Sequence, residues 1–264
     1  MKKKLLALAA AAVLGAMGTS ASASVLTYPF PDFTINELSV PGSTGNAALV
    51  ADKINGGYAE ILTVSNTGGF TASAYADFGA YFGNGGTNLV SGQLGCSISP
   101  NCYNLYAVFK SVGQVVSPTL FQGLSGEFNL YLDPNQNTTK TLVDAVTLAT
   151  LGNTADDFLL ASSTSLTFGV GTTISPTAFE FQFNPQTLTA AGSAFFVGPN
   201  PFFMVAQIDG NVIGAPNPIV PGTFDVTGAA NVSFNNVPEP GSLALLGLGL
   251  AGMGLLQRRR KSAH

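Results

Sequence analysis

The chain has very few of the side chains on which most catalytic chemistry depends. Its 264 residues include a single histidine, His264, at the last position, and no arginine occurs before Arg258. A terminal imidazole excludes Ser-His-Asp and Cys-His sites and histidine metal centres, because each needs imidazole beside its partner residues. The missing arginines exclude bidentate phosphate clamps from most of the chain. We therefore expect a protein that is not an enzyme.

Other common binding devices are also missing. No glycine cluster precedes the Lys-Ser or Lys-Thr pair of a phosphate-binding loop, so Gly83-Asn84-Gly85-Gly86 is interpreted as a turn. The chain has no tryptophan, which offers the largest flat aromatic face for stacking on sugars. Tyrosines are present, and half-buried positions in a sheet explain them better than a carbohydrate platform does. No repeat of fixed period is evident, which disfavours solenoids and propellers.

The N-terminus has the three parts of a secretory signal peptide. Lys2-Lys3-Lys4 is a positive region, Leu5 to Met17 is an apolar, alanine-rich region, and Ala21-Ser22-Ala23 is a small-residue cleavage site. We expect residues 1–23 to be removed and the exported chain to begin at Ser24.

The C-terminus combines a short rigid motif, an apolar run and a basic end. The motif Val237-Pro238-Glu239-Pro240 precedes sixteen uncharged residues, Gly241 to Leu256, and then the basic cluster Arg258, Arg259, Arg260 and Lys261. Sixteen helical residues span about 24 Å, slightly less than a bilayer core of about 30 Å. We expect a short transmembrane helix, with the basic cluster stopping transfer at the inner membrane. An ordinary membrane anchor is the alternative.

The segment between these two ends is acidic. Residues 24–236 contain three lysines and thirteen acidic residues, a net charge of −10, whereas the whole chain carries −4. This balance excludes nucleic acid as a partner through a basic face, and it is compatible with binding divalent cations. We expect one exported domain over residues 24–236.

Cys96 and Cys102 are the only cysteines. Two thiols cannot supply a structural zinc site without histidine, and an exported protein matures in an oxidising compartment. We expect a disulfide that closes a small loop.

Alternating apolar and polar residues predict an all-β domain. Phe179, Phe181 and Phe183 alternate with polar neighbours, and the segments 127–132 and 232–234 repeat this pattern. Between the runs lie turn-forming clusters, namely Asn55-Gly56-Gly57, Asn66-Thr67-Gly68-Gly69, Asn84-Gly85-Gly86 and Pro199-Asn200-Pro201. We expect two packed antiparallel sheets, as in a sandwich or jelly roll.

One segment has the spacing of a calcium-binding loop. Asp133, Asn135, Asn137 and Asp144 occupy what would be its first, third, fifth and twelfth positions. Thr138 stands where such a loop has glycine, and Pro134 stiffens its start. The alternative is a polar hairpin turn after a strand that ends at Leu132. No other cofactor is expected.

The C-terminal tail resembles a known sorting signal. Val237-Pro238-Glu239-Pro240-Gly241-Ser242, then Leu245-Leu246-Gly247-Leu248-Gly249 and the terminal arginines, are similar to the PEP-CTERM signal of Gram-negative bacteria. The resemblance implies an exosortase, an integral-membrane enzyme, as a partner. It also implies export in cells that make extracellular polysaccharide.

Short segments of the exported domain resemble the flocculation-associated PEP-CTERM proteins. They are Phe33-Thr34-Ile35-Asn36-Glu37, Ala51 to Glu60, Leu132-Asp133-Pro134 and Pro199 to Phe203. The resemblance implies a surface or matrix protein that contributes to flocculation or biofilm in exopolysaccharide, with no catalytic residues. Two alternatives are a secreted polysaccharide hydrolase that uses carboxylates, such as the adjacent Asp156 and Asp157, and a calcium-dependent carbohydrate-binding module.

Overall fold

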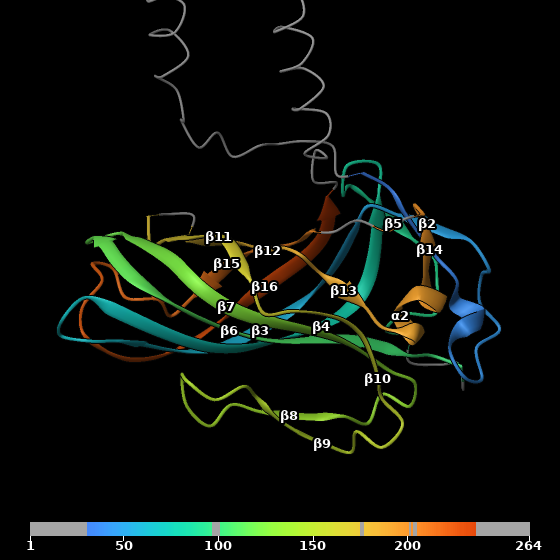
Figure 1. Ribbon diagram of the computed structural model, residues 1–264, viewed down its shortest axis with the longest axis horizontal. Helices are drawn as coiled ribbons and strands as arrows, with labels where there is room; N and C mark the ends of the chain where they lie inside the picture. The colour runs from blue at the N-terminus through green and yellow to red at the C-terminus, as the bar shows by residue number, and fades with distance from the viewer. Residues whose placement is uncertain (1–30, 97–100, 175–176, 201, 203–204, 236–264) are drawn as a thin grey trace, which may run out of the picture.

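The computed structural model describes residues 31–96, 101–174, 177–200, 202 and 205–235. Almost all of the regular structure is β-strand (Figure 1). The elements are β1 (Phe33–Ile35), η1 (Glu37–Ser39), β2 (Leu49–Ala51), β3 (Lys53–Val64), β4 (Gly69–Gly83), β5 (Asn88–Val90), β6 (Asn104–Ser117), β7 (Leu120–Asp133), β8 (Thr139–Thr141), β9 (Thr150–Gly152), β10 (Phe158–Ser163), β11 (Leu166–Thr172), β12 (Ala178–Phe183), β13 (Thr187–Leu188), α2 (Ala190–Phe195), β14 (Phe196–Gly198), β15 (Val205–Ile213) and β16 (Gly222–Asn235).

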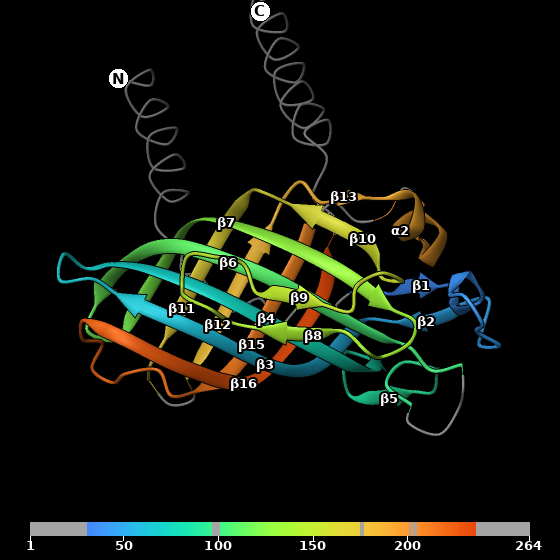
Figure 2. The ribbon, with the colours of Figure 1, turned by 90° about the horizontal axis from the view of Figure 1, so that it is seen from below.

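Eight of these strands form a closed antiparallel barrel. Their order around the barrel is β11, β12, β15, β16, β3, β4, β6 and β7, and β7 then pairs with β11. Each barrel strand lies beside the next barrel strand along the chain, and β16 closes against β3, so the first and last barrel strands are neighbours (Figure 2). This is an up-and-down barrel, in which closure leaves these eight strands without a free edge over their paired lengths.

The predicted all-β class is confirmed, whereas the predicted pair of stacked sheets is not what the structure shows. The sheet closes on itself because β7 pairs with β11 over Leu120 to Gln122. Farther along, β7 pairs with β10 over Phe128 to Leu132. Gly123 and Gly169 face each other at this seam, where a Cβ on Gly169 would lie 3.0 Å from the Gly123 Cα. Closure therefore depends on glycines that allow two backbones to approach.

The barrel interior combines large aromatic side chains with alanines. The Tyr58 ring stacks between Phe109 and Phe179, with ring centroids 5.7 and 4.9 Å apart. Strand β4 contributes three alanines to the interior, Ala72, Ala74 and Ala76, all of them buried. Alternation of small and large residues is how the interior of a small barrel is packed.

One end of the barrel is closed by a second layer of structure. The three-stranded sheet β14-β1-β2 and helix α2 lie there, on the right of Figure 1. Phe33 packs edge-on against Phe196 and Phe234, with centroid distances of 6.1 and 5.4 Å. Thr189 caps the start of this helix, because its side chain accepts the Gly192 N–H. An aromatic plug therefore fills this end.

Outside the barrel, the β8–β9 hairpin forms a short arm (Figures 1 and 2). Beneath it lies a second small apolar cluster of Tyr106, Val108 and Ala149, separate from the main core. Ser73 Oγ also donates to the Thr147 carbonyl at 2.5 Å. The arm therefore buries part of the outer face of the barrel.

The predicted alternations and two of the predicted turns are confirmed. Phe179, Phe181 and Phe183 are buried on β12, while Glu180 and Gln182 between them are only half-buried. Gly68 and Asn84 take the left-handed conformations, with φ of 82° and 57°, that turns between strands require.

The predicted turn at Asn55-Gly56-Gly57 is wrong. These residues lie within β3, where a bulge shifts the register between Asn55 and Gly56. A Cβ on Gly56 would overlap the Asp77 carbonyl on β4, so glycine is needed here for close strand approach and not for a turn.

No helix among the described residues is long and apolar enough to cross a membrane. The predicted signal peptide, residues 1–23, and the predicted span, Gly241 to Leu256, lie outside the described residues.

Candidate functional site

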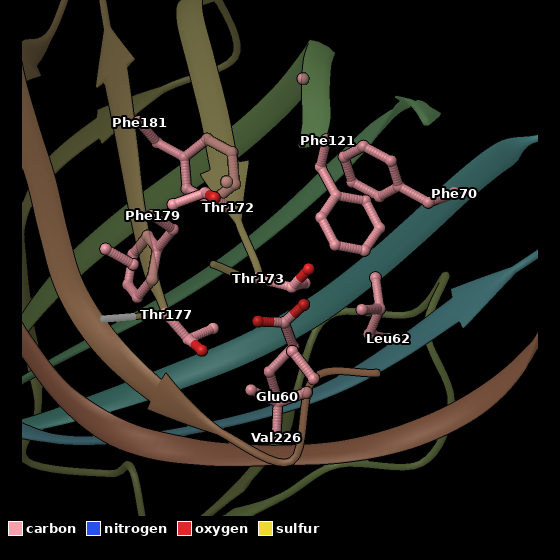
Figure 3. A pocket seen from close by; sticks show the side chains of 14 residues that line it. Glu60, Leu62, Phe70, Phe121, Thr172, Thr173, Thr177, Phe179, Phe181 and Val226 are labelled. Carbon is pink, nitrogen blue, oxygen red and sulfur yellow. The ribbon is translucent and has the colours of Figure 1, made fainter. Parts of the chain in front are cut away.

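The end of the barrel opposite the aromatic plug contains a pocket, shown in Figure 3. At this end lie the turns β3–β4 and β6–β7 and the connections β11–β12 and β15–β16. Its walls include Glu60, Leu62, Phe70, Phe121, Phe179 and Phe181, and we call it the Glu60 pocket. The centre of a water-sized sphere can reach about 50 Å³ of it. This is room for a few water molecules or one small head group, since a single water needs about 10–15 Å³ by the same measure.

Glu60 is the acidic side chain of this pocket. It lies on β3 on the same face as Tyr58 and Leu62, and Figure 3 shows its carboxyl group pointing into the pocket, on the side of Thr173. The Tyr58 hydroxyl donates to its Oε2. Burial among apolar side chains raises the pKa of Glu60 from 4.5 to about 8, because desolvation disfavours the charged form.

Thr173, which follows β11, places a second polar group in this pocket. It is 2 % exposed, and its Oγ1 has no hydrogen-bond partner among the described residues. The backbone of Thr173 is fixed, because its N–H donates to the Thr119 carbonyl and its carbonyl accepts from Asn217. Sequence reasoning missed the whole pocket. The one available signal was an acid at an inward position of β3, between the apolar Tyr58 and Leu62.

A second group of polar side chains lies near the end of β7. Carboxylate oxygens of Asp133, Asp156 and Asp157 lie within 4.8 Å of one another, and we call this group the three-aspartate cluster. It could hold a metal ion through oxygen ligands of the kind that calcium prefers. The adjacent Asp156 and Asp157, singled out in the sequence, thus lie beside Asp133, which the calcium-loop pattern had selected.

The calcium-loop residues Asp133, Asn135, Asn137 and Asp144 have separate hydrogen-bonding roles. Asp133 is buried, and its carboxylate accepts the backbone N–H groups of Asn135, Asn137 and Thr138 at 3.2, 3.3 and 2.9 Å. This bonding is that of the polar turn given as the alternative. The side chains of Asn135 and Asn137 are exposed.

Asp144 belongs to a different turn. Its carboxylate accepts the N–H groups of Val146 and Thr147 at 2.8 and 2.6 Å, and these bonds, that of Thr147 first, lower its pKa. Asp133 and Asp144, at the two ends of the predicted calcium loop, therefore each bond to backbone N–H groups of their own turn. The acidic oxygens that lie close together are those of the three-aspartate cluster.

The other two members of the three-aspartate cluster differ in their hydrogen bonding. Asp157 accepts from the Tyr106 hydroxyl at 2.6 Å and from Thr138 Oγ1, yet burial raises its pKa above the ordinary value. Asp156 Oδ2 is buried and has no hydrogen-bond partner among the described residues.

Cys96 and Cys102 form a disulfide, as predicted. Their Cα atoms lie 5.3 Å apart. The Cys96 carbonyl accepts from the Gln136 side chain at 3.1 Å, which connects this loop to the turn after β7.

The predicted sorting residues, Val237 to Pro240, and the predicted stop-transfer residues, Arg258 to Lys261, lie outside the described residues. Comparison with known protein families nevertheless identifies this part of the chain. The chain carries a PEP-CTERM protein-sorting motif at residues 236–261. Both predicted groups fall inside the matched range.

The PEP-CTERM motif implies export and a C-terminal, membrane-anchored sorting signal of the kind that an exosortase recognises. No curated protein and no solved structure matches the chain. The barrel and its pocket are therefore interpreted from their own residues.

Proposed function

We propose that this chain is a non-catalytic surface or matrix protein of a Gram-negative bacterium, sorted by an exosortase, that contributes to cell aggregation in extracellular polysaccharide. The PEP-CTERM motif at residues 236–261 carries the proposal. In this proposal the inner membrane holds the chain transiently, and the exported domain acts outside the cell.

The composition of the exported domain supports a binding role over a catalytic one. Residues 24–236 contain no histidine and no arginine, and their net charge is −10. Each of the three lysines has an aromatic or acidic neighbour: Lys53 lies over Phe82, and Lys110 and Lys140 form ion pairs. Contact with an anionic polysaccharide would meet repulsion, screened over about 8 Å at physiological ionic strength. Aggregation therefore requires bridging cations, a neutral glycan or apolar contacts.

Deleting the gene while polysaccharide synthesis stays intact tests the aggregation role. We expect the cells to sediment more slowly and form smaller aggregates, with an unchanged amount of secreted polysaccharide. Aggregation equal to that of the parent strain would contradict the proposed role.

A motif variant separates sorting from the activity of the barrel. Replacing Pro238, Glu239 and Pro240 with alanine preserves the apolar run and the basic cluster. We expect this protein to stay in the membrane fraction and not to restore aggregation, whereas the unaltered gene restores it. Normal release of the alanine variant would argue against recognition of this motif.

A further inference from the structure

The Glu60 pocket holds an acid that has no cation of its own. Each of the three lysines of the described residues has a partner elsewhere: Lys53 lies 5.1 Å from the Phe82 ring centroid, Lys110 is 3.2 Å from Glu127, and Lys140 is 2.7 Å from Asp77. Burial accordingly acts on the Glu60 carboxyl without an opposing positive charge.

Four phenylalanines are among the residues that line the pocket around this acid. Phe70 and Phe121 meet edge to face with centroids 5.3 Å apart, and Phe179 and Phe181 lie 5.6 Å apart across the pocket from them (Figure 3). The faces of aromatic rings attract cations, most strongly where water is excluded, and cages of such rings bind quaternary ammonium groups. A carboxylate beside several rings therefore favours an organic cation over an anion.

The buried Thr173 hydroxyl is a second polar group that a ligand in this pocket can reach. Its Oγ1 has no partner among the described residues, although it lines the same pocket as Glu60. Buried hydroxyl groups are nearly always hydrogen-bonded, so we expect this one to bond to water or to a polar group of a ligand in the pocket.

We propose that the Glu60 pocket binds the ammonium group of a small organic cation, with the Glu60 carboxylate as its counter-ion and the phenylalanine rings as its walls. The head group enters the pocket, where the buried Thr173 Oγ1 can bond to a hydroxyl of the ligand or to water, and the rest of the ligand extends through the open side. This role goes beyond the proposed function and does not depend on sorting or aggregation.

Binding releases one proton when Glu60 is protonated beforehand. The cation and the neutral carboxylic acid become an ion pair plus a free proton. Because the pKa of Glu60 is about 8 in the empty pocket, the affinity should rise about tenfold per pH unit below that value and level off above it. A neutral ligand that accepts a hydrogen bond from the acid would show the opposite trend, with affinity falling above about pH 8.

Few other groups can produce this pH dependence. Tyr58, on the same strand, is a titratable side chain whose hydroxyl donates to Glu60, and Glu60 is the one charged residue among those that line the pocket in the described part of the chain. The residues paired with Glu60 on the neighbouring strands are Val226 and Ala74, and the wall residues from β7, β11 and β12 carry no charge. Asp225 on β16 is exposed and lies outside the pocket.

Calorimetric titration of the purified exported protein with tetramethylammonium, choline and 3,3-dimethylbutanol tests the proposal. The last compound is the neutral isostere of choline. We expect choline to bind at least tenfold more tightly than its isostere near pH 8. We also expect the affinity for choline to fall about tenfold for each pH unit below 8. Failure of both cations to bind at about 10 mM would overturn the proposal, as would equal, pH-independent binding of choline and its isostere.

Three variants locate the site. Glu60→Gln keeps the size of the side chain and should lower choline affinity at least tenfold while removing the pH dependence. Asp225→Asn removes one exposed carboxylate and should leave binding unchanged. Phe179→Leu keeps an apolar wall but removes a ring, so it should weaken choline more than the neutral isostere. If Glu60→Gln and Phe179→Leu both fold and bind choline as the parent does, the pocket is not the site.

Discussion

Replacing Glu60 with glutamine should make the protein more stable at neutral and alkaline pH. The carboxyl has a pKa of about 8 when folded and 4.5 in an ordinary environment. Below pH 4.5 it is protonated in both the folded and the unfolded chain. As pH rises from there to about 8, only the unfolded chain loses the proton, so the free energy of unfolding falls with increasing pH. Above about pH 8 the carboxyl is ionised in both states, and the free energy of unfolding stops falling on account of this group.

The size of this effect follows from the two pKa values. One pKa unit corresponds to about 1.4 kcal/mol, so the shift from 4.5 to about 8 sets an upper limit of about 5 kcal/mol. Glu60 is half-buried at a pocket that opens to solvent, which reduces the expected effect to about 2–4 kcal/mol. Glutamine has no charge to desolvate, so Glu60→Gln removes this part of the pH dependence.

Urea unfolding of both proteins between about pH 4 and pH 9 gives the comparison directly. We expect the stability of Glu60→Gln relative to the parent to increase through this range and to level off near pH 8. Asp225→Asn, which removes an exposed carboxylate, should show a much smaller change. Parallel curves for the parent and Glu60→Gln would refute the argument that burial raises the pKa of this group.

Three further predictions follow from other parts of the structure. Gly113→Ala should cost about 2–4 kcal/mol in urea unfolding, because its Cβ would overlap the Gln122 carbonyl, whereas Gly57→Ala, with nothing within 4 Å, should cost under about 1 kcal/mol. Reducing the Cys96–Cys102 disulfide, with a sequence separation of 6, should cost at most about 2–3 kcal/mol, and alkylation before reduction should find no free thiol. The calcium hypothesis predicts a higher melting temperature in millimolar calcium, lost in Asp156→Asn; melting curves unchanged by calcium or chelator would reject it.

Local sequence patterns predicted the strands well because a strand's two faces are set by alternate residues. The alternation at Phe179, Phe181 and Phe183 corresponds directly to β12, and the close pair Cys96 and Cys102 gave the disulfide. Neither inference required knowledge of distant parts of the chain.

Barrel closure and the two polar sites could not be predicted in this way. The seam depends on Gly123 meeting Gly169, and nothing in either local segment marks that pairing. Asp133 and Asp157 come together only because β10 pairs with β7. The calcium-loop pattern selected Asp144 by spacing alone, whereas backbone donors hold that side chain in its own turn.

The role of Glu60 could not be predicted from local sequence either. As a single acid in an apolar strand it resembles any surface carboxylate, and its environment is created by β7, β11 and β12 from other parts of the sequence. Its chemistry follows from the closed barrel and not from its neighbours along the chain.

Intact-mass measurement of the protein recovered outside the cell tests the proposed sorting most directly. The predicted chain begins at Ser24 and lacks Gly241 to His264, because the signal peptide and the sorting tail are both removed. A mass that includes Arg258 to Lys261 would contradict exosortase processing and indicate an ordinary membrane anchor.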